Sequence, residues 1–479
     1  MPHCNLQTTL IASGLLFFTG ISTPCLADNP ATVTRQVSLE SITRSAIESD
    51  YPYRQANQPA SDQLKLAPGL SVNYLTREAA NRSDMMALWP AHGIATHLIS
   101  CIEGKRKAIG LNKNGAVKYN PSIQSIELAT GKVRTLVRGM DRCDGIRATD
   151  WGSIIATEEA GYGFVYELIR PLEARNISIS DRGLPGKPAL TSAPQQFIKR
   201  QHLPVIAWEG FTVTAAGVVI AGDELRPKVI SARSGGGSIY KFIPERLRRS
   251  TQAITQLEQS PLVNGKSYAL LAYCDNSKRA FDQDCETGHA RWVEIDAVQA
   301  RNSADTNTAT GFYRPEDLHT DPLFKGKGLR FCWANTGNKH IEQYGEVICA
   351  IDHEPESISP TSNIKLTRFV RGNNDMNQLD NLAFQPHSGH LYILEDNPNG
   401  DIFACLRDNE NKDLISDGCF KIASVKDSSA EPTGLVFGRD GTTAYLSIQH
   451  SDDSDMPTVD DYKTDDILVI SGFENIKKK

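Results

Sequence analysis

Short apolar segments that end in acidic or amide residues recur along the whole chain. Each opens at a glycine or another small residue, continues through β-branched or aromatic residues, and leads through a loop into a second such segment. Short alternating runs bounded by turn residues are typical of antiparallel strand pairs. Six copies are present: His92–Gly104, Asp150–Ile169, Ala216–Ile243, Gly328–Asp352, Ser388–Arg407 and Asp440–Ile470.

Just upstream of five copies lies a further strand with a polar start. The starts are Cys143-Asp144-Gly145-Ile146, Glu209-Gly210-Phe211, Glu316-Asp317-Leu318, Asp380-Asn381-Leu382 and Glu431-Pro432-Thr433-Gly434-Leu435. Six irregular all-β repeats with long insertions predict a six-bladed β-propeller with a few short helices. A large β-sandwich or two stacked β domains are the alternatives. Glu245–Glu258 is the best candidate for a helix, as an excursion between blades.

The N-terminus carries an apolar run, Leu10–Ile21, of signal-peptide length and too short to span a bilayer comfortably. Cys25-Leu26-Ala27 offers a small-x-small cleavage site before Asp28. We therefore predict a signal peptide over residues 1–27, an irregular arm over 28–82 and a catalytic propeller over 83–479. No later stretch is apolar enough to span a membrane, so we expect an exported, periplasmic or secreted protein.

The net charge of −6 comes from 51 basic and 57 acidic residues, and no long basic run is present. This balance argues against a nucleic-acid-binding scaffold. We expect a monomer that acts on small molecules.

Eight cysteines follow the expected cleavage site, and export makes disulfides plausible. The predicted local pairs are Cys274–Cys285, Cys332–Cys349 and Cys405–Cys419. The remaining two, Cys101 and Cys143, either bond to each other or serve another purpose.

An arginine stands beside acids in the segment Phe312–His319. Pro315 biases Arg314 toward an extended conformation, in which Arg314 and Glu316 share a face. An arginine next to an acid suits recognition of an anion held beside a metal. A local ion pair in a surface turn is the alternative.

In a propeller the innermost strands line a central channel, so equivalent strand starts should converge at one mouth. We expect the following side chains to meet there: Cys143, Glu209, Arg314, Glu316, Asp380 and Glu431. Acids at the ends of the next strands turn at the same rim: Glu103, Glu159, Asp223 and Glu395. Crowded carboxylates raise one another's pKa unless cations neutralise them. Oxygen ligands with flexible spacing suit calcium, and carboxylates with one thiolate suit iron.

Several segments between about residues 88 and 470 resemble the PhoX-type alkaline phosphatases, which are exported bacterial phosphomonoesterases and phosphodiesterases. The matching segments are HLISCIEG, DRCDGIRATDWGSIIATEE, WEGFTV, GDE followed by GSIYKFIPERL, YRPEDL, LDNLAF, LEDN and EPTGLVFGRDGTTAYLSIQH. The resemblance implies a six-bladed propeller with two ferric irons and several calcium ions at one end of the channel. In that family the cysteine and some glutamates hold iron, other acids hold calcium, and the arginine grips the phosphate.

Two features depart from the family pattern. The N-terminus has no twin-arginine export signal. The family's Cys-Gly-Gly…Pro-Trp-Gly segment is replaced here by Cys-Asp-Gly-Ile-Arg-Ala-Thr-Asp-Trp-Gly, so Asp144 and Arg147 change the charge near the expected cluster.

We therefore predict a metal-dependent phosphatase that hydrolyses phosphate esters at an iron and calcium cluster, with Arg314 binding the phosphate. A calcium-dependent lactonase or organophosphate hydrolase is one alternative, and Cys143 separates it because a single-calcium hydrolase needs no thiolate there. A non-catalytic binding propeller whose calcium ions staple the blades is another.

Overall fold

The structure is a computed structural model that describes residues 54–226, 236–275, 285–338, 342–358, 363–409, 411–449 and 455–473. The predicted signal peptide and the first part of the predicted arm lie outside these residues. Within them the chain is almost entirely β-structure, with one α-helix, α1 (Ala300–Thr306), and short 3₁₀ turns η1 (Ala60–Asp62), η2 (Pro171–Glu173), η3 (Leu257–Gln259) and η4 (Pro261–Val263). None of the helices in this described part is both long and apolar enough to cross a membrane.

The first two sheets come from the N-terminal half. One has the order β13 (Leu190–Thr191), β12 (Ile177–Asp181), β8 (Val133–Arg138), β7 (Pro121–Glu127), β4 (His97–Ile102) and β3 (Ser83–Trp89). The next has the order β14 (Phe197–Arg200), β11 (Val165–Ile169), β10 (Ser153–Glu158) and β9 (Cys143–Ala148). A separate ribbon, β5 (Ala108–Leu111) with β6 (Val117–Tyr119), lies in the loop between β4 and β7.

The middle of the chain forms one nine-stranded sheet. Its first part is β15 (Trp208–Val213), β16 (Val219–Asp223), β17 (Ile239–Pro244), β18 (Gly265–Cys274) and β19 (Thr287–Ile295). It continues through β23 (Ile364–Arg371), β22 (Glu346–Asp352), β21 (Leu329–Asn335) and β20 (Pro315–Thr320). Two of the expected blades are thus joined, because β19 pairs with both β18 and β23.

Two sheets from the C-terminal part each recruit a strand from the N-terminal segment. One is β24 (Leu379–Phe384), β25 (Leu391–Glu395), β26 (Asp401–Cys405), β27 (Cys419–Val425) and β1 (Leu64–Leu66). The other is β28 (Glu431–Phe437), β29 (Thr443–Gln449), β30 (Thr464–Ser471) and β2 (Ser71–Ala80). The described part of the predicted arm is therefore an outer layer of these sheets, in which β2 pairs antiparallel with β30.

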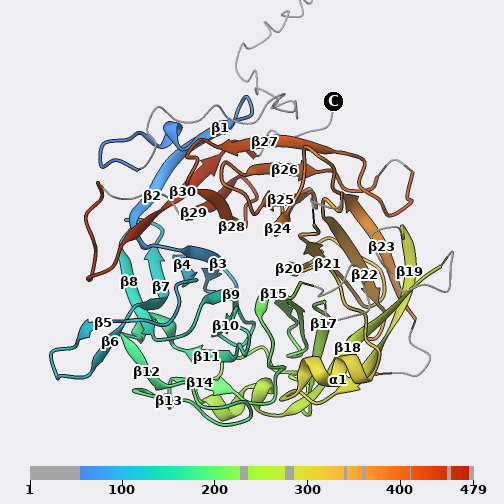
Figure 1. Cartoon of the computed structure of the whole chain (residues 1–479), viewed down its shortest axis with the longest axis horizontal. Coiled ribbons are helices and arrows are strands. Elements are labelled where there is room, and N and C mark those ends of the chain that lie inside the picture. The colour runs from blue at the N-terminus through green and yellow to red at the C-terminus, as the bar shows by residue number, and fades with distance from the viewer. Residues whose placement is uncertain are drawn as a thin grey trace, which may run out of the picture. The chain divides into compact units, whose positions relative to one another are not determined.

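Six strands lie innermost, one from each of four sheets and two, β15 and β20, from the two ends of the nine-stranded sheet. They adjoin one another in the closed order β3, β9, β15, β20, β24, β28 and back to β3. Figure 1 shows these six labels nearest the centre of the arrangement, with the later strands of each sheet progressively farther out. The prediction of an all-β, propeller-like arrangement with few helices is confirmed.

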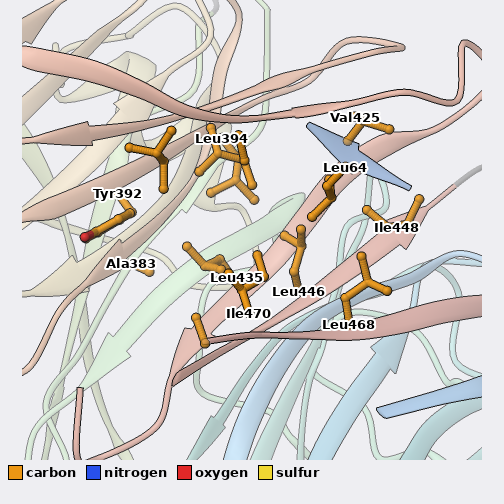
Figure 2. Close-up of a cluster of buried hydrophobic side chains, with 14 of the residues drawn as sticks. Leu64, Ala383, Tyr392, Leu394, Val425, Leu435, Leu446, Ile448, Leu468 and Ile470 are labelled. Carbon is orange, nitrogen blue, oxygen red and sulfur yellow. The ribbon is translucent and has the colours of Figure 1, made fainter. Parts of the chain in front are cut away.

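The core lies between the faces of neighbouring sheets. In the largest C-terminal cluster, Leu394 of β25 packs with Leu446 of β29 and Leu468 of β30, and all three are fully buried. Figure 2 shows these side chains filling the space between the two sheets, with Leu64 and Val425 at the outer end. Burying one such leucine contributes about 2 kcal/mol, so alternating apolar residues on facing strands fix how the sheets lie.

The inner strands approach one another more closely than a side chain allows. A Cβ on Gly145 of β9 would lie 2.2 Å from the backbone oxygen of Glu209 on β15. A Cβ on Gly210 of β15 would lie 2.2 Å from Oδ1 of Asp317 on β20. Glycine at these two positions brings the neighbouring acidic residues of adjacent strands together.

All three predicted local disulfides are present: Cys274–Cys285, Cys332–Cys349 and Cys405–Cys419. Cys332 and Cys349 stand directly opposite each other on β21 and β22, as do Cys405 and Cys419 on β26 and β27. The other two cysteines form a fourth bond, Cys101–Cys143.

The predicted helix at Glu245–Glu258 is wrong. This segment runs without helical structure until η3, and its backbone amides bond to distant segments instead: Arg248 to Ala216 and Ile254 to Trp151. The apolar residues that suggested a helical face pack separately onto the sheets, Ile254 and Leu257 among them. The observed helix, α1, lies farther along the chain.

Candidate functional site

Five of the inner strands begin with the same irregularity. Their first residue pairs with the last residue of the second strand, and a bulge follows. The first residues are Ser83, Cys143, Trp208, Pro315 and Leu379. In every case the next residue is acidic: Asp84, Asp144, Glu209, Glu316 and Asp380. Because a bulge re-aims a side chain, it turns each acid out of the regular strand alternation.

These acids line one strongly polar cavity of about 170 Å³. Ten carboxylates and three arginines surround it: Asp84, Glu103, Asp144, Glu159, Glu209, Glu224, Glu316, Asp380, Asp396 and Glu431, with Arg82, Arg142 and Arg314; Gln449 also lines it. Carboxylates in this excess cannot all stay ionised in a confined space without further cations.

The pKa values of the carboxylates that line the cavity reflect this crowding. Burial, and then the charges of neighbouring carboxylates, raise the pKa of Asp144, Glu209 and Asp380 well above the ordinary range. Burial also raises the pKa of Asp84 to about 7, with the charge of Glu103 as the next cause. In the cation-free protein these side chains therefore retain protons, and a bound cation would replace them.

Six of the predicted metal ligands meet at this cavity. They are Glu103, Glu159, Glu209, Glu316, Asp380 and Glu431, and Arg314 lines the cavity with them. At these six positions the structure brings the strand starts and the strand ends together around one cavity, while their binding of a metal stays a prediction.

Two predicted ligands point elsewhere. Asp223 forms an ion pair with Arg301, with Nη2 to Oδ1 at 2.6 Å, and accepts the backbone amide of Ala207. Glu395 accepts the backbone amides of Asn377 and Asp401. The residues that follow them, Glu224 and Asp396, line the cavity instead. Adjacent residues of a strand face opposite ways. A shift of one residue in the prediction therefore selects the acid that bonds within the fold instead of the acid that lines the cavity.

Cys143 also differs from the prediction. Its side chain is fully buried among apolar residues such as Ile146 and is bonded to Cys101. A sulfur in a disulfide carries no thiolate, which is the form that binds a metal. As the structure stands, the thiolate ligand predicted at Cys143 is not available, and the residue after it, Asp144, lines the cavity.

The three arginines of the cavity occupy one equivalent position. Arg82, Arg142 and Arg314 each immediately precede the first residue of an inner strand, and each has a left-handed backbone, with φ of 67°, 56° and 59°. The extended conformation expected for Arg314 is therefore wrong, although its side chain does reach Glu316. Non-glycine residues in this region are uncommon and cluster at functional sites.

Two of these arginines are held by carboxylates. Arg314 Nε lies 2.8 Å from Glu316 Oε1 and also bonds to Glu224, while its Nη1 lies 2.7 Å from Asp396 Oδ2. Burial alone would lower the pKa of Arg314, but the charges of these carboxylates outweigh it and raise the pKa above its ordinary value. Arg314 therefore lines the cavity and is paired with carboxylates there, while its role in binding a phosphate stays a prediction.

Arg142 is held in the same way by Glu159 and Glu103, with Nε to Glu159 Oε2 at 2.8 Å. The side chain of Arg82 differs, because it is exposed and makes no hydrogen bond or ion pair with the residues that the structure describes. Arginine recurs directly before three strand starts in the sequence, and this recurrence is the signal that points to Arg82 and Arg142 as well as to Arg314.

The carboxylates fit a cation. Two triplets present oxygen atoms within 4.8 Å of one another, Asp144 with Glu159 and Glu209, and Glu209 with Glu316 and Asp380. Oxygen sets of this kind suit hard cations such as calcium. The thiolate-bound iron implied by the family resemblance does not fit, because the only sulfur at this position is in a disulfide.

Fold and site together define an all-β, propeller-like protein whose inner strands present a cluster of carboxylates and arginines to one polar cavity. Residues 217–452 match the model of the family "Alkaline phosphatase PhoX". This match confirms the predicted family resemblance and the prediction of an alkaline phosphatase-like enzyme. No curated protein sequence gives a significant match.

The fold is shared with the structure of Pseudomonas fluorescens PhoX in complex with vanadate, described as a transition state analogue. The two are 14% identical, the match covers 90% of this chain and 99% of that one, and the TM-score is 0.59. A glucose dehydrogenase-type oxidoreductase from Thermus thermophilus is less similar, with 11% identity, 84% and 100% coverage and a TM-score of 0.45.

Proposed function

We propose that this protein hydrolyses phosphate esters of small molecules in a metal-dependent reaction at the central cavity. The observation that carries the proposal is the combination of two overlapping carboxylate triplets with three arginines in one polar cavity, within a chain that matches the PhoX family model. Carboxylates that collect cations and arginines that bind oxyanions are together what a phosphate ester requires.

Arg314 is the proposed phosphate-binding and catalytic residue. Its Nη2 makes no hydrogen bond with the described residues, whereas Nε and Nη1 are fixed by carboxylates. The guanidinium is therefore held in one orientation, so that little rotational freedom is lost when it binds a phosphate oxygen. As negative charge develops on the phosphoryl oxygens, this fixed positive charge stabilises it.

Arg82 and Arg142 extend the same role. Arg142 also lines a neighbouring cavity of about 380 Å³, together with Lys105 and Arg301. We propose that the organic part of the substrate lies there while Arg82, which is exposed at the rim, contacts the phosphate from outside. Cavities of this size accept a small phosphorylated compound.

The carboxylate triplets would hold the cations. Calcium fits the oxygen donors, and the two ferric irons implied by the resemblance would have carboxylate ligands in this chain. Bound cations would neutralise phosphate charge and lower the pKa of an attacking water. The residues themselves fix the positions of the cations and keep the cavity polar, since Glu209 belongs to both triplets.

The remaining features of the proposal concern the whole protein. We propose six blades, with the nine-stranded sheet counted as two, and the boundaries at residues 27 and 82 as predicted. We also propose a periplasmic or secreted monomer, because four disulfides among the described residues suit an oxidising compartment.

A calcium-dependent lactonase remains the second candidate. Cys143 no longer separates the two functions, because it is held in a disulfide. The three arginines favour a phosphate substrate, since a neutral lactone gives no reason for guanidinium groups at equivalent positions of three strands.

The test is hydrolysis of p-nitrophenyl phosphate and of bis(p-nitrophenyl) phosphate, with elemental analysis of the same sample. Arg314→Ala should lower kcat/KM at least about 100-fold, because a charged hydrogen bond to phosphate contributes about 1.5–3 kcal/mol and more in the transition state. Its metal content should not change. Arg249→Ala is the matched control, since Arg249 pairs with Glu356 at the surface. A metal-loaded protein that hydrolyses lactones but neither phosphate ester would contradict the proposal.

A further inference from the structure

Asp144, and not Cys143, occupies the ligand position of its inner strand. Cys143 pairs with the last residue of the second strand of its sheet, as Trp208 does on β15 and Pro315 does on β20. Asp144 follows Cys143 and is therefore equivalent to Glu209 on β15 and to Glu316 on β20. The register of the sheets therefore assigns the acid of β9 to the ring of cavity carboxylates.

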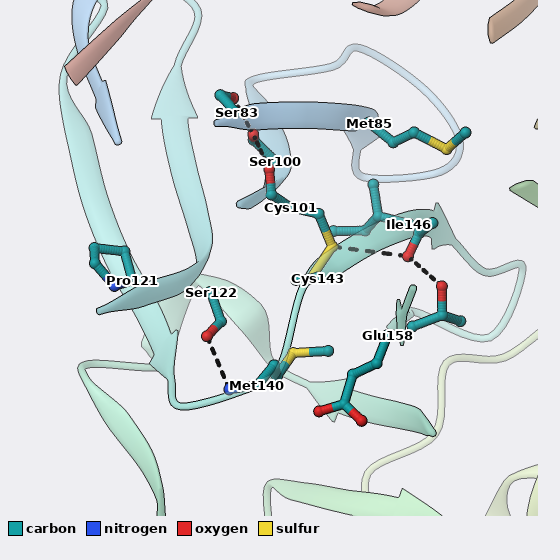
Figure 3. The surroundings of a disulfide bond; sticks show 12 residues. Ser83, Met85, Ser100, Cys101, Pro121, Ser122, Met140, Cys143, Ile146 and Glu158 are labelled. Carbon is teal, nitrogen blue, oxygen red and sulfur yellow. Dashed lines mark hydrogen bonds between the residues drawn. A yellow bond between two sulfur atoms is a disulfide. The ribbon is translucent and has the colours of Figure 1, made fainter. Parts of the chain in front are cut away.

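The sulfur of Cys143 lies on the other side of the strand. Figure 3 shows the Cys101–Cys143 bond between β4 and β9, beside Ile146 and Met140. The Sγ of Cys101 lies 3.7 Å from the backbone oxygen of Gly145. Neither cysteine lines the cavity, so the disulfide ties two neighbouring sheets together within the apolar core.

The carboxyl group of Asp144 is buried without full compensation. Asp144 is 2% exposed, and its Oδ1 has no hydrogen-bond partner among the described residues. An oxygen that is desolvated and unpaired is costly unless a ligand meets it.

We propose that Asp144 is a cation ligand, acting with Glu159 and Glu209 in a site made only of oxygen donors. The ligand atoms of these three residues lie within 4.8 Å of one another. The inference rests on the proposed function and deepens it, because it states which cations the cavity takes. Carboxylates alone favour hard cations such as calcium over softer ions that a thiolate would bind.

The first test compares Asp144→Asn with Asp141→Asn in the full mature chain. Asp141 lies on the same segment, but its carboxylate faces Arg182 and the backbone amide of Arg106, outside the central cavity. After removal of metals, calcium is titrated by calorimetry, and metals in the untreated protein are counted by elemental analysis. Asp144→Asn should lose one bound cation or bind calcium at least tenfold more weakly, while Asp141→Asn should match the wild type.

Thermal stability separates a ligand from a structural residue. Without metals, Asp144→Asn should melt at the same temperature as the wild type or higher, because the buried carboxylate has no full set of partners. In excess calcium it should melt lower than the wild type. An equal calcium-induced rise in melting temperature for both proteins would overturn the inference.

A second variant excludes the sulfur. The double substitution Cys101→Ser with Cys143→Ser should keep the number of bound cations, even if it melts earlier. Loss of one cation in this variant together with full retention in Asp144→Asn would assign the ligand to Cys143 and refute the proposal. Phosphate ester hydrolysis is measured in parallel on the wild type. If it is absent while Asp144→Asn still loses a cation, the proposed function fails and the assignment of Asp144 stands.

Discussion

Asp84 should make the metal-free protein less stable as the pH rises. Its carboxyl lies at the start of β3, where Gln449 Nε2 donates a hydrogen bond at 2.7 Å and Thr433 donates another. Burial and the charge of Glu103 raise its pKa from 3.8 to about 7. A carboxyl with a raised pKa in the folded chain binds more protons there than in the unfolded chain. Stability is therefore lost as the pH rises from the unfolded value toward the folded one.

The magnitude follows from the width of this window. From about pH 5 to about pH 7 the unfolded side chain is charged and the folded one is not, and each pH unit is worth about 1.4 kcal/mol. The penalty therefore grows by about 3 kcal/mol over this range. Asp84→Asn cannot ionise, so its free energy of unfolding relative to the wild type should rise by that amount between pH 5 and pH 8. The hydrogen bonds to Thr433 and Gln449 change by a constant that cancels in this comparison.

The assay is urea unfolding of both proteins in EDTA at several pH values, followed by circular dichroism. The comparison also removes the effect of partly buried histidines such as His319, whose pKa is lowered by burial and which therefore act in the opposite direction in both proteins. A difference in stability that stays constant or shrinks from pH 5 to pH 8 would refute the reasoning. Saturating calcium should reduce the pH dependence, because bound cations replace the protons of the ring.

Three further outcomes follow. Arg82→Ala should raise KM for p-nitrophenyl phosphate about tenfold, with kcat and metal content little changed, since its side chain has no partner in the described structure and lines the cavity; an unchanged KM would remove it from the site. Gly210→Ala should cost at least about 2 kcal/mol in urea unfolding, because its Cβ would overlap Asp317, whereas Gly161→Ala, with open space around it, should cost less than about 1 kcal/mol. Calcium at 100 times its dissociation constant should stabilise the protein by about 2.7 kcal/mol per site, and a melting temperature insensitive to EDTA would argue against the cation site.

The general arrangement was predictable because its causes are local. Alternating apolar residues and glycine-rich turns mark the strands, and a repeated strand order closes into a ring. The disulfides Cys332–Cys349 and Cys405–Cys419 were predictable for the same reason, since each joins residues that stand opposite on adjacent strands. The convergence of Glu209, Glu316 and Asp380 followed from the equivalence of the strand starts.

The errors at the site share one physical cause, an offset of a single residue. Which of two adjacent residues faces the cavity depends on where a bulge falls, and a bulge is a property of strand pairing. Glu224 lines the cavity while Asp223 pairs with Arg301, and Asp144 lines it while Cys143 is held in a disulfide. Composition near a strand start therefore predicts a cluster of acids well, but not which acid belongs to it.

The apolar residue after each strand start supplies the missing register. On five inner strands the acid precedes a buried apolar residue by two positions, as Asp144 precedes Ile146 and Glu209 precedes Phe211. The residue between them is Gly145 or Gly210, where a Cβ would collide with the adjacent strand. The adjacent strands approach each other so closely at these glycines that no side chain fits there. The same close approach brings Asp144 and Glu209, on adjacent strands, within reach of one cation. Packing of the inner strands and assembly of the site are thus one constraint, which is why a substitution at these glycines should change cation binding as well as stability.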